Sequence, residues 1–401
     1  MSRNSDPVPF SSPVLGPEEE AAVIKVMRSG WLTTAGEAKA FEEEFASYVD
    51  CKFAVTLNSG TAALHLGLEA MGITAGDYVV TTPYTFTATA EVIRYLGATP
   101  LFCDIEENGY NIDPELLEQT IVNAPKPPKA LIPVHIAGLP CDMAGISEIA
   151  EKHGMGILED AAHAFPVKSN DGKWTGTSGT AGAYSFYANK TMTTGEGGML
   201  VTDDSAIAER ARIMRLHGID REIWNRYTGN GASWRYRVVE AGYKYNMTDI
   251  AAAIGRIQLK KAADLKLRRS AIAGQYTKAF SAMDNSEGLP RFFLPPSGNG
   301  GPFSHAWHLY ILGLNPPAGS AVEEEQYRDA CIEYLTKSGI GVSVHFIPLH
   351  IMPYYQNAYN FKPEDFPRSY KRFRRAVSLP IFPTMTPDQV DRVIRAVENM
   401  P

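Results

Sequence analysis

The sequence has little cysteine and no long apolar run. Its 401 residues include four cysteines, and no two of them stand close enough for a zinc or redox pair. Four cysteines in so long a chain do not make a disulfide framework, which favours the cytoplasm as the compartment. The apolar runs are far shorter than the roughly 20 residues that a membrane span needs. Segment 1–10 is polar and lacks the apolar core of a secretory signal. We therefore expect a cytoplasmic protein with no membrane association.

An excess of basic charge is also missing. Lys and Arg number 38 against 45 Asp and Glu, which gives a formal net charge of −7. Nucleic-acid binding needs a dense basic face, so we expect no nucleic-acid partner. The chain has no Gly-x-Gly-x-x-Gly and no Walker loop, which argues against a dinucleotide or ATP site. No histidine pair has the spacing of a zinc site, so we predict no metal.

The chain does contain a regular alternation of short apolar runs and helical patterns. Strands are expected at 53–57, 78–82, 100–103, 130–135, 156–159 and 199–202, with helices between them. This order predicts a parallel sheet covered by helices. A helix over 249–268 would then lead to strands at 307–314 and 342–346 and helices at 323–338 and 387–400. We expect an α/β fold with a large α/β/α domain (1–255), built on a mostly parallel sheet, and a smaller C-terminal α/β domain (256–401).

Polar residues that follow the expected strands are the candidates for chemistry, because ligands bind at the carboxyl ends of parallel strands. Ser59, Gly60 and Thr61 follow the first strand and open a helix, where free N–H groups and hydroxyls suit a phosphate. An ordinary N-cap by Ser or Thr explains the same residues. The segment alone leaves both interpretations open.

Two charged residues stand in apolar surroundings further along the chain. Asp160 ends a strand, where a carboxylate must pair with a salt-bridge partner, an N-cap or a cationic ring nitrogen. Lys190 is the only charge in 181–195, and desolvation there would lower its pKa and make it a candidate Schiff-base nucleophile. An ordinary surface lysine in a loop is the alternative, and the residue alone does not decide between them. A phosphate site, a carboxylate and such a lysine are together the parts that hold pyridoxal phosphate. Phe86, on a strand-end loop, is placed either to stack on the cofactor ring or to pack in the core.

Several longer segments carry a family resemblance. They are "LNSGTAAL", "VVTTPYTFTATA", "ILEDAAHAFP", "YSFYANKTMTTGEGGMLVTDD", "GYKYNMTDIAAAIGRIQL", "HAWHLYIL", "GVSVHFIPLH" and "SLPIFP". The chain resembles, over roughly residues 10–400, the sugar aminotransferases of the DegT/DnrJ/StrS family. The resemblance implies a fold type I pyridoxal-phosphate transferase that acts as a homodimer with shared active sites.

The resemblance also implies roles for individual residues. Lys190 would form the Schiff base with pyridoxal phosphate and Asp160 would hold the pyridinium proton, while Phe86 and His163 would contact the ring. The phosphate would be bound by Ser59, Gly60, Thr61 and Ser185, and by Asn246 from the other subunit. The nucleotide-sugar would be bound by Trp31, Thr33, Tyr187, His345 and Phe346.

The expected reaction is transfer of an amino group from L-glutamate to a nucleotide-linked keto-sugar. Within the family, the last of these segments look most like enzymes that aminate C4 of UDP-linked 4-keto-6-deoxy sugars for surface glycans. Amination at C3 of a 3-keto nucleotide sugar, or a pyridoxal-phosphate sugar dehydratase, are the alternatives. A related dehydratase group carries His in place of the lysine, so Lys190 favours amine transfer.

Overall fold

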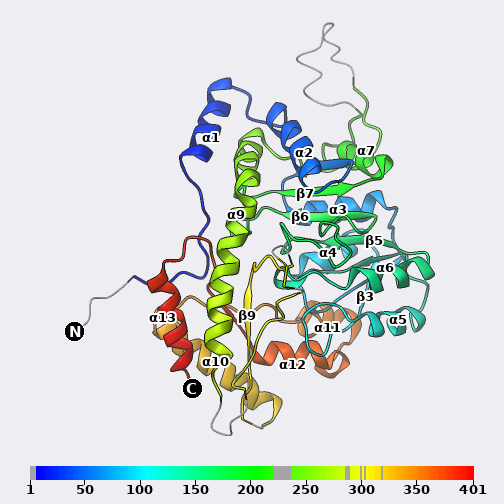
Figure 1. The fold of residues 1–401 in the computed structure, drawn as a ribbon. Helices are drawn as coiled ribbons and strands as arrows, with labels where there is room; N and C mark the ends of the chain where they lie inside the picture. Colours follow the sequence, from blue (N-terminus) through cyan, green and yellow to red (C-terminus); the bar gives the residue numbers. More distant parts are fainter. Residues whose placement is uncertain (1–5, 221–235, 285–289, 299, 302–303, 318) are drawn as a thin grey trace.

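The computed structural model describes residues 6–220, 236–284, 290–298, 300–301, 304–317 and 319–401. In these residues, a large sheet and a small sheet lie along the two ends of one long helix, α9 (Asp249–Phe280) (Figure 1). The large sheet has seven strands. They are β1 (Phe53–Leu57), β2 (Tyr78–Thr81), β3 (Thr99–Phe102), β4 (Ala130–Ile132), β5 (Gly156–Asp160), β6 (Ala181–Ser185) and β7 (Gly198–Thr202).

The large sheet is mostly parallel, as the alternation predicts. Its strand order is β1-β7-β6-β5-β4-β2-β3. The pairs β2–β3, β2–β4, β4–β5 and β5–β6 are parallel, and only β7 runs antiparallel to its two neighbours, β1 and β6. Two reversals restore the direction, so β1 runs the same way as β6. The carboxyl ends of β1, β2, β4, β5 and β6 therefore share one edge.

Helices cover both faces of this sheet, because successive strand residues point to opposite sides. Val79 and Leu158 belong to the core under one set of helices, whereas Val80 and Ile157 belong to the core under the other. The first set is α3 (Gly60–Ala70), α4 (Ala88–Tyr95) and α7 (Ser205–Met214). The second set is α2 (Gly36–Tyr48), α5 (Pro114–Val122), α6 (Met143–Lys152) and the start of α9. The three layers are those of the expected α/β/α domain.

The small sheet has the antiparallel order β10-β9-β8 within the described residues. Its strands are β8 (Phe292–Phe293), β9 (Tyr310–Leu314) and β10 (Ala376–Leu379). The helices of this part are α10 (Ala321–Lys337), α11 (Pro353–Tyr359), α12 (Pro367–Arg375) and α13 (Pro387–Glu398). Leu259 of α9 lies in the core of the large sheet, and Tyr276 of α9 lies in the core of the small one. The boundary expected at 255/256 falls inside α9, and the division into two domains stays a prediction.

The bounds of several expected elements differ from the structure; the strand expected at 130–135, for example, ends at Ile132. The helix over 249–268 continues to Phe280 because its apolar face finds a second core. The strand expected at 307–314 begins only at Tyr310, since Ala306 and Leu309 donate their N–H groups to Gly138 and Ala137 instead of a strand. The strand expected at 342–346 is wrong: only Ser343 forms a bridge, to Ser378.

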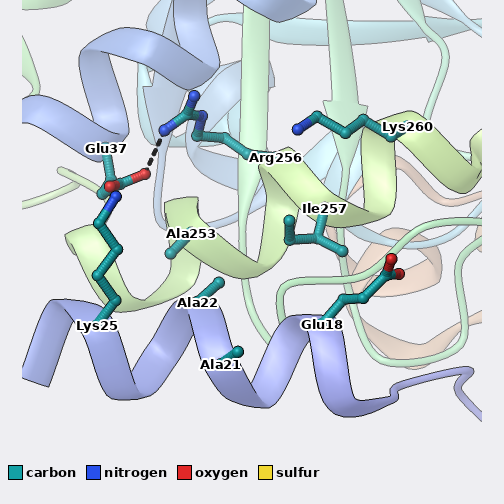
Figure 2. A pocket seen from close by; sticks show the side chains of 9 residues that line it. All are labelled: Glu18, Ala21, Ala22, Lys25, Glu37, Ala253, Arg256, Ile257 and Lys260. Carbon is teal, nitrogen blue, oxygen red and sulfur yellow. Dashed lines mark hydrogen bonds and ion pairs between the residues drawn. The ribbon is translucent and has the colours of Figure 1, made fainter.

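The N-terminal helix α1 (Pro17–Ser29) packs on α9. Figure 2 shows Ala21 and Ala22 of α1 facing Ala253 and Ile257 of α9, and the three alanines are small enough to let the helices approach closely. Beside them, Arg256 forms an ion pair with Glu37 at 2.5 Å. In the described part of the chain, no helix combines the length and apolar character of a membrane span.

Candidate active site

A cavity of about 610 Å³ opens at the shared carboxyl edge of the large sheet. Its wall comes from the ends of β5 and β6, the loops that follow them, the start of α3 and two segments of the small-sheet part. Predicted site residues that line it are Ser59, Gly60, Thr61, Phe86, Asp160, His163, Ser185, Tyr187, Lys190, His345 and Phe346. Ser59, Phe86 and Asp160, which are far apart in sequence, thus converge where the strand-end argument places them. His345 and Phe346 were expected here only from the family resemblance.

The start of α3 forms one end of the cavity. Ser59 is the N-cap, and its hydroxyl accepts the N–H of Ala62 at 3.1 Å. A Cβ on Gly60 would stand 2.8 Å from Cβ of Ser185, so only glycine lets the helix start approach β6 this closely. The N–H groups of Gly60 and Thr61 belong to the first turn and have no partner within the helix. With the hydroxyls around them they form a site suited to a phosphate.

Asp160 lies at the end of β5 with a buried carboxyl group. Oδ2 accepts a hydrogen bond from the Thr89 hydroxyl at 2.9 Å, and Oδ1 accepts the N–H of Ala162 at 3.2 Å. Burial raises the pKa of Asp160, while these two donors and the charge of Lys190 act in the opposite direction. The hydrogen bonds from Thr89 and Ala162 therefore orient the carboxylate of Asp160, which lines a cavity that can accept a cationic partner.

Lys190 lies in the turn between β6 and β7, and its N–H donates to the carbonyl of Tyr187 at 3.0 Å. Desolvation lowers the pKa of the Lys190 amine from 10.5 to about 8; Asp160 raises it and the positive charge of Arg269 lowers it further. A lysine with such a pKa has a sizeable neutral fraction near neutral pH, which is the nucleophilic form. The desolvation expected from its uncharged sequence surroundings is present.

Aromatic and imidazole rings form the rest of the wall. The rings of His163 and Phe346 stack at 5.8 Å, and His163 lies 4.3 Å from the ring of His308. Burial lowers the pKa of both histidines, so both are neutral. Within the described residues, Nδ1 of each is buried without a hydrogen-bond partner. Phe86 is 59% exposed, so its ring is not a core aromatic and is free to stack on a planar ligand.

Three predicted site residues do not line this cavity: Trp31, Thr33 and Asn246. The Asn246 amide donates to the Thr34 hydroxyl at 2.7 Å and its carbonyl oxygen accepts from Lys244. Residues 245–246 also pair with the end of β1, since Asn58 donates its N–H to Tyr245 at 2.7 Å. Asn246 and the loop 31–34 thus form a second cluster directly before the Ser59 turn.

Asp249 holds this second cluster together. Its carboxylate accepts the N–H groups of Ala35 at 2.7 Å, Ala38 at 3.0 Å and Glu37 at 3.1 Å, and so caps the start of α2. Its own N–H donates to the carbonyl of Leu32. The loop 31–35 is therefore fixed to the beginning of α9.

Some cavity residues are missing from the sequence-based set. Thr89 orients Asp160, and the pattern that reveals it is the pair Thr85 and Thr89, one helical turn apart, in "TFTATA". His308 and Glu196 also line the cavity. His308 carries no sequence signal of its own, because a buried histidine beside a strand is as easily a packing residue. Within the described residues, no group of three or more His, Cys, Asp or Glu is arranged to hold a metal ion.

Known proteins resemble this chain over almost its whole length. The model of the DegT/DnrJ/EryC1/StrS aminotransferase family matches residues 13–398. The chain belongs to this family. It is 45% identical over 393 residues to the spore coat polysaccharide biosynthesis protein SpsC of Bacillus subtilis, which covers 98% of this chain and 97% of SpsC. The family assignment confirms the resemblance stated from the motifs.

Solved structures of the family agree with the fold. The putative sugar aminotransferase Spr1654 of Streptococcus pneumoniae, in its PMP form, has a TM-score of 0.86 at 30% identity and covers 98% of this chain and 96% of its own. PseC of Helicobacter pylori, an aminotransferase involved in the biosynthesis of pseudoaminic acid, has a TM-score of 0.87 at 27% identity and covers 98% of both chains. Spr1654 has also been solved in a PLP form.

This family member is a pyridoxal-phosphate-dependent aminotransferase. The cavity fits that cofactor on three independent grounds. A helix start offers unpaired N–H groups, a buried carboxylate faces inward, and His163 presents a buried Nδ1 that has no partner within the described chain. When bound, the cofactor withdraws electrons from the carbon that carries the amine.

Proposed function

We propose that this enzyme transfers the amino group of L-glutamate to C4 of a nucleotide-linked, UDP-type 4-keto-6-deoxy sugar, and that the amino sugar enters a surface glycan or glycoconjugate. The observation that carries the proposal is that Lys190, Asp160 and the start of α3 line one cavity, next to the exposed ring of Phe86. The similarity to SpsC, a spore coat polysaccharide biosynthesis protein, and to PseC, an aminotransferase of pseudoaminic acid biosynthesis, supports the sugar substrate. The cytoplasmic location expected from the cysteine content stays a prediction.

Each residue then has a proposed task. Lys190 would hold the cofactor through its aldehyde, and the free Lys190 amine would be the group that accepts and returns the proton of the donor α-carbon. Asp160 keeps the ring nitrogen protonated, Phe86 stacks on one face and His163 lies near the 3-oxygen. Ser59, Gly60, Thr61 and Ser185 bind the phosphate. Tyr187, His345 and Phe346 contact the sugar from the same cavity.

We further propose a homodimer in which Asn246, Trp31 and Thr33 serve the cavity of the other subunit. All three lie outside the cavity of their own chain, yet they sit in one cluster with Thr34 and Asp249. Large apolar side chains of the same N-terminal region are exposed: Leu15, Ile24, Met27 and Leu32. We propose that these exposed side chains contact the other subunit, since apolar side chains that gather on a surface mark protein–protein interfaces.

The substrate proposal is tested by isotope transfer. The holoenzyme is incubated with ¹⁵N-labelled L-glutamate and a UDP-linked 4-keto-6-deoxy sugar, and the product is analysed by mass spectrometry and NMR. We expect one ¹⁵N on C4 per oxoglutarate released. A deoxygenated product without ¹⁵N would favour the dehydratase instead, and label on C3 of a 3-keto sugar would move the site of amination.

The dimer proposal is tested by mixing two inactive variants, Lys190→Ala and Asn246→Ala. If sites are shared, a mixed dimer contains one cavity with both residues intact and one with neither, so mixing restores activity. If each cavity uses its own Asn246, mixing restores nothing, and the shared-site proposal is wrong.

A further inference from the structure

The molecule contains a buried arginine beside the active site that the proposed function does not use. Arg269 lies in α9 and is 2% exposed. Burial lowers the pKa of its guanidinium to about 10, so the group keeps its charge at neutral pH. Within the described residues, no carboxylate lies within ion-pair distance of it, and its Nε has no hydrogen-bond partner. Burying a cation without a counter-ion costs free energy of folding, so a functional reason for Arg269 at this position is expected.

The partners of Arg269 are all backbone carbonyls, and they come from three segments. Nη1 donates to Ile381 at 2.6 Å, to His308 at 3.3 Å and to Trp307 at 3.4 Å. Nη2 donates to the carbonyl of Asn189 at 3.4 Å. Asn189 directly precedes Lys190, and His308 lines the same cavity as Lys190. One side chain therefore joins the lysine turn of the large sheet to the small-sheet part of the cavity wall.

The helix holds this guanidinium in a fixed place. Tyr276, seven residues further along α9 and hence on the same helix face, donates its hydroxyl to the carbonyl of Pro380 at 2.9 Å. Arg269 and Tyr276 thus bind two consecutive carbonyls, of Pro380 and Ile381. Thr277 adds a hydrogen bond of 3.0 Å between its hydroxyl and that of Tyr310 in β9. These contacts fix α9 to the small-sheet part about two helical turns beyond Arg269.

We propose that Arg269 is a positioning residue that fixes the Lys190 turn against the His308 segment and acts on the Lys190 amine through its unpaired positive charge. The inference rests on the proposed role of Lys190. The fork of the guanidinium suits this task because it presents several donors in a fixed plane, which a lysine does not.

The charges around Lys190 allow such an effect. The ionisable groups that line the cavity with Lys190 come from several elements. They are Asp160 at the end of β5, His163 in the turn after it, Tyr187 in the turn of Lys190, Glu196 before β7, His308 before β9, and His345. The buried histidines are neutral, since burial lowers the pKa of His163 and His308 well below the usual range and that of His345 to about 4. Asp160 raises the pKa of Lys190, and Arg269 lowers it. Without the charge of Arg269, the effect of Asp160 on Lys190 is no longer opposed by this cation, and the pKa of the Lys190 amine rises.

The test measures the pH at which the visible absorbance of the cofactor-loaded protein changes, without turnover. In Arg269→Gln the midpoint should move upward by about one pH unit, because a like charge no longer disfavours the protonated nitrogen. Arg269→Lys keeps the charge and should keep the wild-type midpoint. Its compact ammonium cannot reach all three segments, so kcat should fall about tenfold while KM for glutamate changes little.

Arg268→Gln is the matched control, since Arg268 is exposed and pairs only with Asp264 among the described residues. The absorbance midpoint and kcat of this variant should be unchanged.

The outcomes separate this inference from the proposed function. A wild-type midpoint in Arg269→Gln, or wild-type kcat in Arg269→Lys, would overturn the role of Arg269 while the glutamate response of the wild type still supports the aminotransferase. If Arg269→Gln does not fold, Arg269→Lys decides, because a shifted midpoint despite the retained charge contradicts the electrostatic part. A wild-type protein without any cofactor band would instead refute the role of Lys190 itself.

Discussion

The hydroxyl of Thr89 donates a hydrogen bond of 2.9 Å to Oδ2 of Asp160, and it accepts one in turn from Thr85 at 2.9 Å. Two threonines one turn apart at the start of α4 therefore orient the carboxylate proposed to hold the cofactor ring. Since a hydrogen bond to the charged form favours that form, this pair offsets part of the burial that raises the pKa of Asp160.

Replacing Thr89 should raise the pKa of Asp160 further. In Thr89→Val the carboxylate loses a donor to a charged group, worth about 1.5 to 3 kcal/mol, and the acidic limb of the kcat/KM profile for glutamate should move up by about one pH unit. The control is Thr87→Val, whose hydroxyl bonds Glu91 outside the cavity. An unchanged acidic limb in Thr89→Val would show that the hydroxyl does not act on Asp160.

The lowered pKa of Lys190 predicts how the apoprotein takes up its cofactor. Only the neutral amine attacks an aldehyde, so the rate of pyridoxal-phosphate capture should rise with pH through a midpoint near 8 and then level off. Stopped-flow absorbance across pH 6 to about 11 measures it. A midpoint near the ordinary value of 10.5 would mean that the amine is not desolvated.

Gly60 should tolerate no side chain. In Gly60→Ala the new Cβ would meet Cβ of Ser185 at 2.8 Å and its Cα at 3.3 Å, so the start of α3 must move away from β6. We expect cofactor affinity to fall by roughly ten- to a hundredfold, measured by titrating the apoprotein with pyridoxal phosphate. Gly274→Ala is the control: it lies in the interior of α9, where a Cβ meets nothing within 4 Å. That change should leave affinity intact and stabilise the protein by about 0.5 to 1 kcal/mol.

Asp249 should matter for both stability and substrate binding. Asp249→Asn weakens a carboxylate that receives three N–H groups at the start of α2, and urea unfolding should show a loss of about 1 to 3 kcal/mol. Because the same contacts hold the loop 31–35, KM for the sugar should rise, and cofactor affinity, to which Asn246 alone of this cluster contributes, should fall less. Asp50→Asn, at an exposed residue in the left-handed region where Asn is well tolerated, should change neither quantity. Equal losses of sugar and cofactor affinity would argue against a specific effect on the loop.

The large domain was predictable because its signals are local. Apolar runs at β1, β2, β4 and β5 with helical patterns between them indicate a parallel sheet, and its carboxyl edge locates Ser59, Asp160 and Lys190 before any contact is known. Even the desolvation of Lys190 follows from its uncharged neighbours. The roles of Phe86, His163, Asn246 and the substrate-binding residues came from the family resemblance, and they stay predictions.

The rest depends on contacts that a sequence does not display. The segment 342–346 reads as a strand by composition, yet the carbonyl of His345 accepts from the Tyr84 hydroxyl and its ring bonds Ser378, so the chain lines the cavity instead. Arg269 gives no sequence signal, because its partners are backbone carbonyls of residues 38 to 112 positions away, and a residue of any type has such a carbonyl. His308 becomes a cavity residue only through the ring of His163.

The most direct test of the account is the visible spectrum of the purified protein with pyridoxal phosphate, before and after addition of L-glutamate alone. We predict a yellow absorption band in the wild type that glutamate converts to the pyridoxamine form, and the loss of this response in Lys190→Ala but not in Lys173→Ala, a change at an exposed lysine. A band that ignores glutamate would contradict the proposed donor. A wild-type response in Lys190→Ala, or no band at all in the wild type, would contradict the central claim that Lys190 carries the cofactor in this cavity.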